Sequence, residues 1–420
     1  MASQAIAMLG ASQDVGAGMV TTIDKGPLKG VKVIELGNLV AGPFCARILA
    51  EFGADVIKIE LPKEGDPIRK WRVLGKNGTS LWWYVQSRNK KCITLDCRRP
   101  EGLTILKELI RGADVLVENF RPGTLAKWGL TEEVLKELNP KLIVSRISGF
   151  GQDGPYKDRV AFGAIAEAIS GLRYVTGYPD RPPTRVGISL GDSVAALYSV
   201  IGILMALYYR DVKGGGGQEI DVALYEAVFS LMEGMVTEYD QEGVIRERTG
   251  SVLPGITPSN VYPTKDDGFV VIAANGDAIV RRLLVTIGRE DLVNDKQWVS
   301  NEARAKHAEA IDKIISDWSL ALTQEECLSR LTAADVPASR IYSVVDIVKD
   351  PQYQARDMIL EMNDPALGET KVPGVVPKLS KTPGSVKWLG PEMGRDNLEV
   401  LKSIGLTESQ IAAMKEQGII

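Results

Sequence analysis

The sequence predicts an α/β protein with a Rossmann-like parallel-sheet large domain and a smaller α+β domain. Short apolar runs of strand length alternate with helix-like segments from Leu28 to Asp192, which is the pattern of βαβ units in a parallel sheet. After Ala227 the alternation stops, and a Gly/Pro-rich loop precedes one strand and several helices. A length of 420 residues is enough for two or three domains.

The composition is that of a soluble globular protein, with 45% hydrophobic and 25% charged residues. A net charge of −4 and scattered Lys and Arg residues argue against binding to nucleic acid. The longest apolar run, residues 195–209, is too short to span a bilayer and is typical of a buried helix. The four cysteines have no zinc spacing, so we expect no metal site, and their low density suits a reducing compartment. Residues 1–22 contain no Lys or Arg, which argues against a signal or transit peptide, and we expect a cytoplasmic protein.

The first βαβ unit is predicted over residues 31–59. We expect a strand at 31–36, a helix at 44–52 and a second strand at 55–59. The turn between them, GNLVAGP, lacks the GxGxxG spacing of nicotinamide-binding turns. Because it follows a parallel strand, its backbone could approach a ligand, although a plain tight turn explains the same residues.

Basic residues lie next to the later strands, which are predicted at 89–96, 113–118 and 142–147, with helices at 100–111 and 129–138. These basic residues are Lys90, Lys91, Arg121 and Lys127. Single exposed lysines are usually no more than solvated surface charges. Collected at one rim of the sheet, the four would suit the phosphates of a nucleotide-like cofactor.

Asp192 lies in the most distinctive stretch of the chain, residues 184–227. We expect a strand at 185–190, a Gly-Asp-Ser turn, a long apolar helix at 194–209, and a strand at 219–222 after a run of four glycines. The partial positive charge of a helix N-terminus favours an ionised acid at this place. Asp192 is therefore interpreted either as an ordinary helix N-cap or as the nucleophile of an acyl-transfer enzyme.

His307 is the single histidine, and it lies in a charged, helix-like stretch. A Ser-His-Asp or Cys-His mechanism would have to use it, and a site with several histidine ligands is excluded. We therefore expect any covalent catalysis to use a carboxylate.

Several motifs follow one another in a fixed order along the chain. They include ELGNLVAGP, NKKCITLD, VENFRPG, SGFGQDGP, RVGISLGD and LPGITPSNVYP. With these motifs, the chain from about Leu28 to the C-terminus resembles the class III CoA-transferases. That family includes formyl-CoA transferase, carnitine CoA-transferase and succinyl-CoA-dependent transferases for malate, itaconate or benzylsuccinate.

The resemblance implies a ring-shaped chain that is interlocked with a second subunit in a dimer, either a homodimer or a heteromer with a related subunit. The implied division is a flexible tail at 1–25, a large CoA-binding domain at 26–227, a linker and small α+β domain at 228–345, and a segment at 346–420 that returns to the large domain. Its partners would be an acyl-CoA and a carboxylic acid, with neither nucleic acid nor a membrane. Coenzyme A would act as a thioester substrate, and we expect no tightly bound cofactor.

The same resemblance assigns roles to residues, and Asp192 is the catalytic aspartate. The implied CoA contacts are Val40, Ala41, Lys90, Lys91, Asn119, Phe120, Arg121 and Lys127. The loops at the reacting acyl group would include Phe162, Gly163, Gly250 and Gly255. Two positions depart from the family pattern. Leu61 replaces a basic residue, and Gly163 stands where some members carry a carboxylate, which leaves room or a different charge pattern for the acyl group.

The expected reaction moves CoA from an acyl-CoA donor, for which we expect succinyl-CoA, to a dicarboxylate such as malate, citramalate, itaconate or benzylsuccinate. It would pass through an aspartyl anhydride and an aspartyl-CoA thioester. Candidate clamps for the distal carboxylate of the acceptor are Arg47, Arg72 and Arg159.

Three alternatives stay open at this point. One is a CoA-transferase of the formyl-CoA/oxalate or carnitine type. A second is an α-methylacyl-CoA racemase, which needs a histidine near residues 160–167, where the sequence has none. A third is one subunit of a heteromeric transferase, although Asp192 in an intact GDS setting favours the active type.

Overall fold

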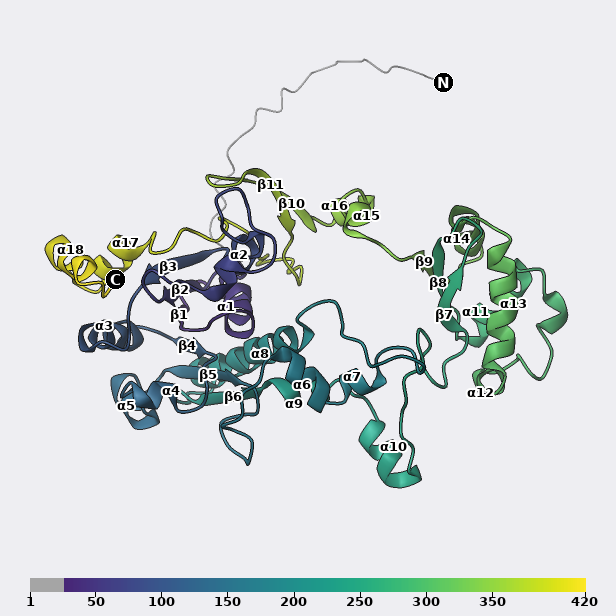
Figure 1. The fold of residues 1–420 in the computed structure, drawn as a ribbon, viewed down its shortest axis with the longest axis horizontal. Coiled ribbons are helices and arrows are strands. Elements are labelled where there is room, and N and C mark those ends of the chain that lie inside the picture. Colours follow the sequence, from purple (N-terminus) through teal and green to yellow (C-terminus); the bar gives the residue numbers. More distant parts are fainter. Residues whose placement is uncertain (1–25) are drawn as a thin grey trace, which may run out of the picture.

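The computed structural model describes residues 26–420, so the predicted tail at 1–25 lies outside the described residues. A large body is built on a six-stranded sheet and a small body on a three-stranded sheet. Figure 1 shows the small body standing apart from the large one and joined to it by two chain segments. The C-terminal segment, drawn in yellow, lies back beside β3 of the large body.

The sheet of the large body is parallel throughout, with the strand order β3-β2-β1-β4-β5-β6. Its strands are β1 Lys32–Glu35, β2 Asp55–Glu60, β3 Lys90–Thr94, β4 Val115–Glu118, β5 Ile143–Ser148 and β6 Glu219–Ala223. The order reverses between β1 and β4, and ligands of open α/β sheets bind at the carboxyl ends of the strands beside such a switch point. The predicted α/β class with a parallel sheet is confirmed.

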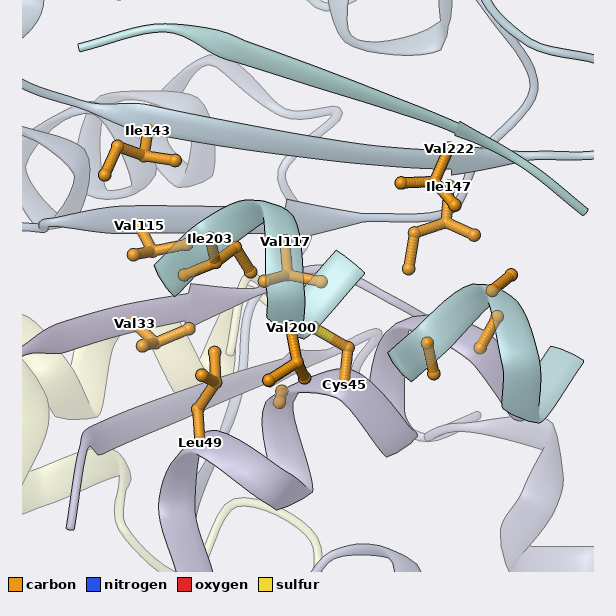
Figure 2. Packing of buried hydrophobic residues seen from close by; sticks show 14 of the residues in the cluster. Val33, Cys45, Leu49, Val115, Val117, Ile143, Ile147, Val200, Ile203 and Val222 are labelled. Atoms are coloured by element: carbon orange, nitrogen blue, oxygen red, sulfur yellow. The ribbon is translucent and has the colours of Figure 1, made fainter. Parts of the chain in front are cut away.

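Helices cover both faces of this sheet. The helices used below are α1 Ala41–Glu51, α2 Leu81–Gln86, α3 Pro100–Arg111, α4 Thr124–Lys127, α5 Glu132–Leu138, α6 Gly163–Ile169, α7 Leu172–Val175, α8 Leu190–Val212, α9 Leu224–Phe229, α10 Met235–Glu242, α17 Asn397–Ser403 and α18 Glu408–Glu416. Because neighbouring strand residues point to opposite faces, Val33 and Val115 pack against α1 and α8, as Figure 2 shows. Their neighbours Ile34 and Leu116 pack against α3, α5 and the C-terminal helices on the other face.

The start of α8 differs from the prediction. The segment 185–190 forms no strand, and the helix begins at Leu190 and ends at Val212 instead of spanning 194–209. Val186 and Ile188 have the β-branched side chains of a strand, but a strand needs a hydrogen-bonding partner and this segment pairs with none of the described strands. Asp192 is therefore the third residue of the helix, and the N-cap is Ser189. The interpretation of Asp192 as the N-cap is wrong.

The helix α8 is also longer than the apolar run 195–209 from which it was predicted. With 23 residues and an apolar composition it is long enough to cross a membrane by these two criteria alone. Half of its apolar window is buried inside the protein, where it contacts α1, β5 and β6. Such burial is the ordinary property of a core helix.

The helix predicted at 129–138 is α5, which begins later, at Glu132, and a separate short helix, α4, ends before it at Lys127. Gly129 lies between them with a φ of 81°, in the left-handed region that glycine tolerates and other residues avoid. Thr131 then caps α5 by accepting a hydrogen bond from the backbone N–H of Val134.

The small body has its own hydrophobic core. Its antiparallel strands are β7 Ser259–Pro263, β8 Phe269–Ala273 and β9 Ala338–Arg340. Its helices are α11 Asp277–Thr286, α12 Asn301–Ala305, α13 Ala308–Leu320 and α14 Gln324–Ala333. The second connection to the large body carries α15 Val344–Ile347, α16 Pro351–Ala355 and the hairpin of β10 Ile359–Asp364 and β11 Gly368–Pro373.

Candidate active site

A cavity of about 200 Å³ lies at the switch point between β1 and β4. Its wall consists of the turn after β1, the turn after β4, the end of β5 and part of the loop before α6. Asp192 in the first turn of α8 completes the lining. The predicted site residues in this lining are Val40, Ala41, Asn119, Phe120, Arg121, Phe162 and Asp192.

The two turns of the cavity wall are tied together by side-chain amides. Asn38 donates its backbone N–H to Asn119 Oδ1 at 2.8 Å, and Asn119 Nδ2 donates back to the carbonyl oxygen of Asn38 at 2.9 Å. Leu39 has a φ of 65°, and its N–H donates to Asp66 Oδ1 at 3.0 Å. The fixed turn presents the N-terminus of α1, at Ala41, to the cavity, where backbone N–H groups and the helix dipole attract anions.

Four fully buried charges support this turn, and we call them the turn network: Glu35, Lys58, Asp66 and Lys90. Lys58 Nζ lies 2.9 Å from Glu35 Oε1 and 2.8 Å from Asp66 Oδ2. Lys90 Nζ lies 2.7 Å from Glu35 Oε2 and donates to the carbonyl oxygen of Pro43 at 2.7 Å. The ammonium of Lys90 has no exposed surface and is bound by protein groups, so its position does not favour the predicted CoA contact, which stays a prediction.

The other predicted cations of the first half lie outside the cavity lining. Lys91 is at the amino edge of the sheet, where its Nζ lies 3.3 Å from Asp55 Oδ1 and 3.0 Å from Glu399 Oε1. The cavity is at the opposite, carboxyl edge, so the predicted CoA contact of Lys91 is not met by its position. Lys127 is exposed at the end of α4.

The glycines predicted to cover the acyl group also lie outside the cavity lining. Gly250 donates its N–H to the carbonyl oxygen of Gly177 at 2.9 Å, in a segment beside α7. Gly255 is exposed, and its carbonyl oxygen accepts a hydrogen bond from Asn301 Nδ2 at 2.7 Å. Their roles at the reacting group stay predictions.

Asp192 and Gly163 are in direct contact where the N-termini of α6 and α8 meet. A Cβ atom at Gly163 would lie 2.3 Å from Asp192 Oδ2, so only glycine leaves this carboxylate its present position. Burial raises the pKa of Asp192 to about 6, the nearby charge of Glu167 adds to the rise, and Arg185 opposes it. A carboxylate with this pKa is mostly ionised at neutral pH and more basic than an ordinary aspartate, which suits a nucleophile.

Glu167 is a residue of this site that the sequence analysis missed. It is fully buried one helical turn after Gly163, and its Oε1 accepts a 3.4 Å hydrogen bond from the backbone N–H of Gly191. Arg173 Nη2 and Arg185 Nε lie 3.5 Å and 3.8 Å from its other oxygen, Oε2. The sequence signal that could have revealed Glu167 is its place as the lone acid in the apolar run AFGAIAEAIS. It follows Gly163 by four residues and therefore lies on the same helix face.

One of the three candidate carboxylate clamps lines the cavity. Arg47 is paired with Glu51 at 2.9 Å along α1 and lies outside the lining. Arg72 is on the surface, with its guanidinium 4.2 Å from the ring centroid of Trp82. Arg159 lines the cavity, in the loop before α6.

Histidine and metal-ligand chemistry are not found at this cavity. His307 precedes α13 in the small body, with its ring centroid 5.9 Å from that of Trp298. Within residues 26–420, no group of three or more His, Cys, Asp or Glu side chains is arranged to hold a metal ion. Among the ionisable groups of the lining, Asp192 is the carboxylate.

The amino-acid sequence is similar to proteins of established activity along almost its whole length. It is 48% identical to a succinyl-CoA–D-citramalate CoA-transferase of Chloroflexus aurantiacus, in a match that covers 94% of this chain and 98% of the relative. It is 41% identical to the β subunit of a succinyl-CoA–L-malate CoA-transferase of the same organism, over 96% of this chain and 100% of the relative.

The fold is similar to that of a solved CAIB/BAIF family protein from Brucella suis. The TM-score is 0.79 at 31% sequence identity, over 90% of this chain and 100% of that one. Residues 28–397 match the model of CoA-transferase family III. These matches span both bodies and include Asp192. The chain therefore belongs to CoA-transferase family III.

Proposed function

We propose that this CoA-transferase moves CoA from succinyl-CoA to a dicarboxylic acid of the citramalate or malate type, with Asp192 as its nucleophile. The observation that carries the proposal is the partly buried carboxylate of Asp192 at the wall of the switch-point cavity, with a pKa raised to about 6 by desolvation and by Glu167. The named substrates of the two relatives from Chloroflexus aurantiacus support the choice of donor and acceptor.

A second cavity extends the site along the carboxyl edge of the sheet. It has a volume of about 240 Å³ and shares Asn38 and Phe120 with the first. Trp128 in its wall lies with its ring centroid 5.2 Å from that of Phe120, so a planar base could stack there. CoA would lie with its adenine in this second cavity, its phosphates near Arg121 and the N-terminus of α1, and its thioester at Asp192.

The proposed reaction begins when the carboxylate of Asp192 attacks the thioester carbonyl of the donor. The C–S bond breaks, CoA leaves as a thiolate, and an aspartyl–succinyl anhydride forms. The thiolate then attacks the aspartyl carbonyl, which releases succinate and leaves an aspartyl-CoA thioester.

The second half repeats these steps in reverse with the acceptor. Its carboxylate attacks the aspartyl-CoA thioester and forms a new anhydride, with CoA thiolate as the leaving group. The thiolate attacks the acceptor's acyl carbon, and the new acyl-CoA leaves as Asp192 regains its carboxylate. No proton has to be transferred, so the reaction needs no general acid or base and no histidine at the cavity.

The proposed assembly is an interlocked dimer in the cytoplasm. One face of α8 is apolar yet exposed, and the exposed residues are Leu197, Ile201, Leu204, Met205 and Tyr208. An exposed apolar face of this length is typical of a subunit interface. The two chain segments that join the separated bodies would let a second chain pass between them (Figure 1). The second chain is a like copy or a related subunit, as the α and β subunits named among the relatives suggest.

A CoA-exchange assay tests the function. Purified protein receives succinyl-CoA with citramalate, malate, itaconate, benzylsuccinate, oxalate or carnitine, and new thioesters are identified by mass spectrometry. We expect transfer to citramalate or malate, and loss of transfer in Asp192→Ala but not in Asp180→Ala, which changes an exposed acid of the preceding loop.

Two outcomes would contradict the proposal. Activity that survives in Asp192→Ala would remove the aspartyl mechanism. Transfer from formyl-CoA to oxalate alone, or to carnitine alone, would replace the proposed substrates. Hydroxylamine trapping gives an independent check, because an aspartyl anhydride or thioester becomes a hydroxamate on the peptide that carries Asp192.

A further inference from the structure

Two arginines lie near the buried acid Glu167 without being part of the cavity lining. Arg173 lies on α7 and Arg185 on the segment that leads into α8. Both contact Glu167, whose other oxygen accepts the N–H of Gly191, the residue before Asp192. Arg185 is also close enough to act on the charge of Asp192. We call Glu167, Arg173, Arg185 and Asp192 the nucleophile cluster.

The guanidinium groups of this cluster are poorly satisfied. Within residues 26–420 neither Arg173 nor Arg185 donates a hydrogen bond, and their contacts with Glu167 are ion pairs of 3.5 Å and 3.8 Å. Arg173 Nε and Glu167 Oε2 are buried without a hydrogen-bonding partner. Buried polar groups are nearly always paired in folded proteins, so Arg173 Nε, which has neither a hydrogen bond nor a close ion pair, is a donor that a ligand could use.

Arg304, an arginine with a structural role in the same chain, shows how a buried guanidinium group is normally hydrogen-bonded. Arg304 is fully buried, and its guanidinium donates to the carbonyl oxygens of Thr257, Trp298 and Asn275 and to the carboxylate of Asp277. The bonds range from 2.7 to 2.9 Å. Four of the five N–H donors of Arg304 are used in this way. Arg185, in contrast, is half-exposed and donates no hydrogen bond within the described residues.

The charges of the cluster change during the proposed reaction. With Asp192 ionised, two carboxylates face two guanidinium groups, and the formal charges cancel. An anhydride or thioester on Asp192 is neutral, so the cluster then carries one positive charge. A substrate carboxylate bound at that moment would restore neutrality in a site of low dielectric constant.

We propose that Arg173 and Arg185 bind the distal carboxylate of the dicarboxylic acid while its other carboxyl group reacts at Asp192. This proposal rests on the proposed function and assigns its specificity to named residues. A guanidinium group binds a carboxylate through two parallel N–H···O bonds, which a monocarboxylic acid cannot form at its far end. Glu167 is a positioning residue, because it holds both arginines next to Gly191 and so beside the nucleophile.

Arg159 is the competing candidate, since it lines the cavity itself. Its guanidinium, however, stacks on Tyr156 with its central carbon 3.5 Å from the ring centroid, and the residue is exposed. It makes no ion pair with a residue of the nucleophile cluster in the described part of the chain. A variant of Arg159 therefore belongs in the test.

The test measures label exchange between succinate and succinyl-CoA, and CoA transfer to butyrate, which has a methyl group in place of the distal carboxylate. In Arg185→Gln and Arg173→Gln we expect the KM for succinate to rise about 10- to 100-fold, with little change for butyrate. Arg185→Lys should recover only part of the loss, because an ammonium group cannot make the paired contact. Arg181→Gln, on the exposed loop before Arg185, should behave as wild type.

An equal loss with both acids would overturn the proposal, and so would a selective loss in Arg159→Gln but not in Arg185→Gln. Calorimetric titration of Asp192→Asn with succinate gives a readout that needs no turnover, because a neutral residue at this position leaves the cluster with the charge it has in the intermediates. Adding Arg185→Gln to this variant should weaken the binding in the same proportion. If the wild-type enzyme transferred no CoA from succinyl-CoA, the proposed function would fail. The titration would still decide for or against the arginine site.

Discussion

The turn network and the nucleophile cluster contain the same formal charges, two acids and two bases, yet they are built in opposite ways. In the turn network, Lys58 and Lys90 meet their carboxylate partners at 2.7–2.9 Å with no side chain exposed. In the nucleophile cluster, the arginines stand 3.5 Å and 3.8 Å from Glu167 and donate no hydrogen bonds in the described structure. Complete pairing fixes a backbone turn, whereas incomplete pairing leaves charge for a substrate.

The pKa values follow this division for Lys58 and Asp192, whereas burial lowers the pKa of Lys90 in spite of its pairing with Glu35. Burial lowers the pKa of Lys58, but the facing carboxylates of Asp66 and Glu35 more than offset this and raise it above its usual value. Burial raises the pKa of Asp192 to about 6, and the neighbouring Glu167 adds to that rise. Charges that stabilise one another support a fold. Charges held at an energetic cost are typical of active sites.

The largest effect we expect comes from breaking the turn network. Lys58→Met leaves Glu35 and Asp66 buried without their shared cation, and it should lower the free energy of unfolding by about 3–5 kcal/mol. Arg185→Met in the nucleophile cluster should change it by less than about 0.5 kcal/mol, because this side chain is half-exposed and weakly paired. Urea unfolding followed by circular dichroism measures both. Similar losses of stability in the two variants would contradict the distinction between a fully paired and an incompletely paired cluster.

Asp192→Asn should make the folded protein more stable while it removes activity. A buried acid with a raised pKa contributes stability while it is protonated, below its unfolded pKa, and that contribution is lost as the pH rises through about 6. At pH 8 the neutral Asn should therefore add about 3 kcal/mol to the free energy of unfolding, with a smaller gain at pH 5. Denaturant unfolding at the two pH values measures this, with Asp180→Asn as the control. A loss of stability at pH 8 would show that the Asp192 charge is well paired.

Gly163→Ala should disturb the nucleophile without unfolding the protein. Its Cβ would lie 2.3 Å from Asp192 Oδ2, so the carboxylate must move, and kcat should fall about 10- to 100-fold. The melting temperature should change little, because Ala is acceptable at the start of α6. Gly187→Ala is the matched control, since a Cβ there meets no atom within 4 Å. An unchanged kcat would mean that Asp192 reacts from another position.

The smallest effect is a shift in the pH profile. The value of kcat/KM for succinyl-CoA should rise with pH and level off, with a midpoint near 6, because the nucleophile must be ionised. Glu167→Gln removes a neighbouring negative charge and should lower the midpoint, whereas Arg185→Gln should raise it. A profile that is flat from pH 5 to 8 would contradict the assignment of Asp192 as the titrating group.

Much of the large body could be predicted because its signals are local. Strands buried on both faces read as continuous apolar runs, so β1, β2, β4 and β5 were found within about two residues of their ends. Motifs identified the family and Asp192, and they indicated the turns at Val40 and Asn119 that line the cavity. The boundary at α8 was missed because β-branched residues favour a strand only where a neighbouring strand can pair.

The sequence by itself determined the fold class and the family and singled out Asp192 as the proposed nucleophile, since each depends on apolar periodicity or on a contiguous motif. Only the tertiary structure decided what the charged residues do. Lys90 was predicted as a phosphate ligand, and the strand order places it against Glu35. Glu167, Arg173 and Arg185 became one cluster through the packing of α6 against α8. Burial and partners set the energy of a charge, and both arise from contacts between distant segments that no local pattern records.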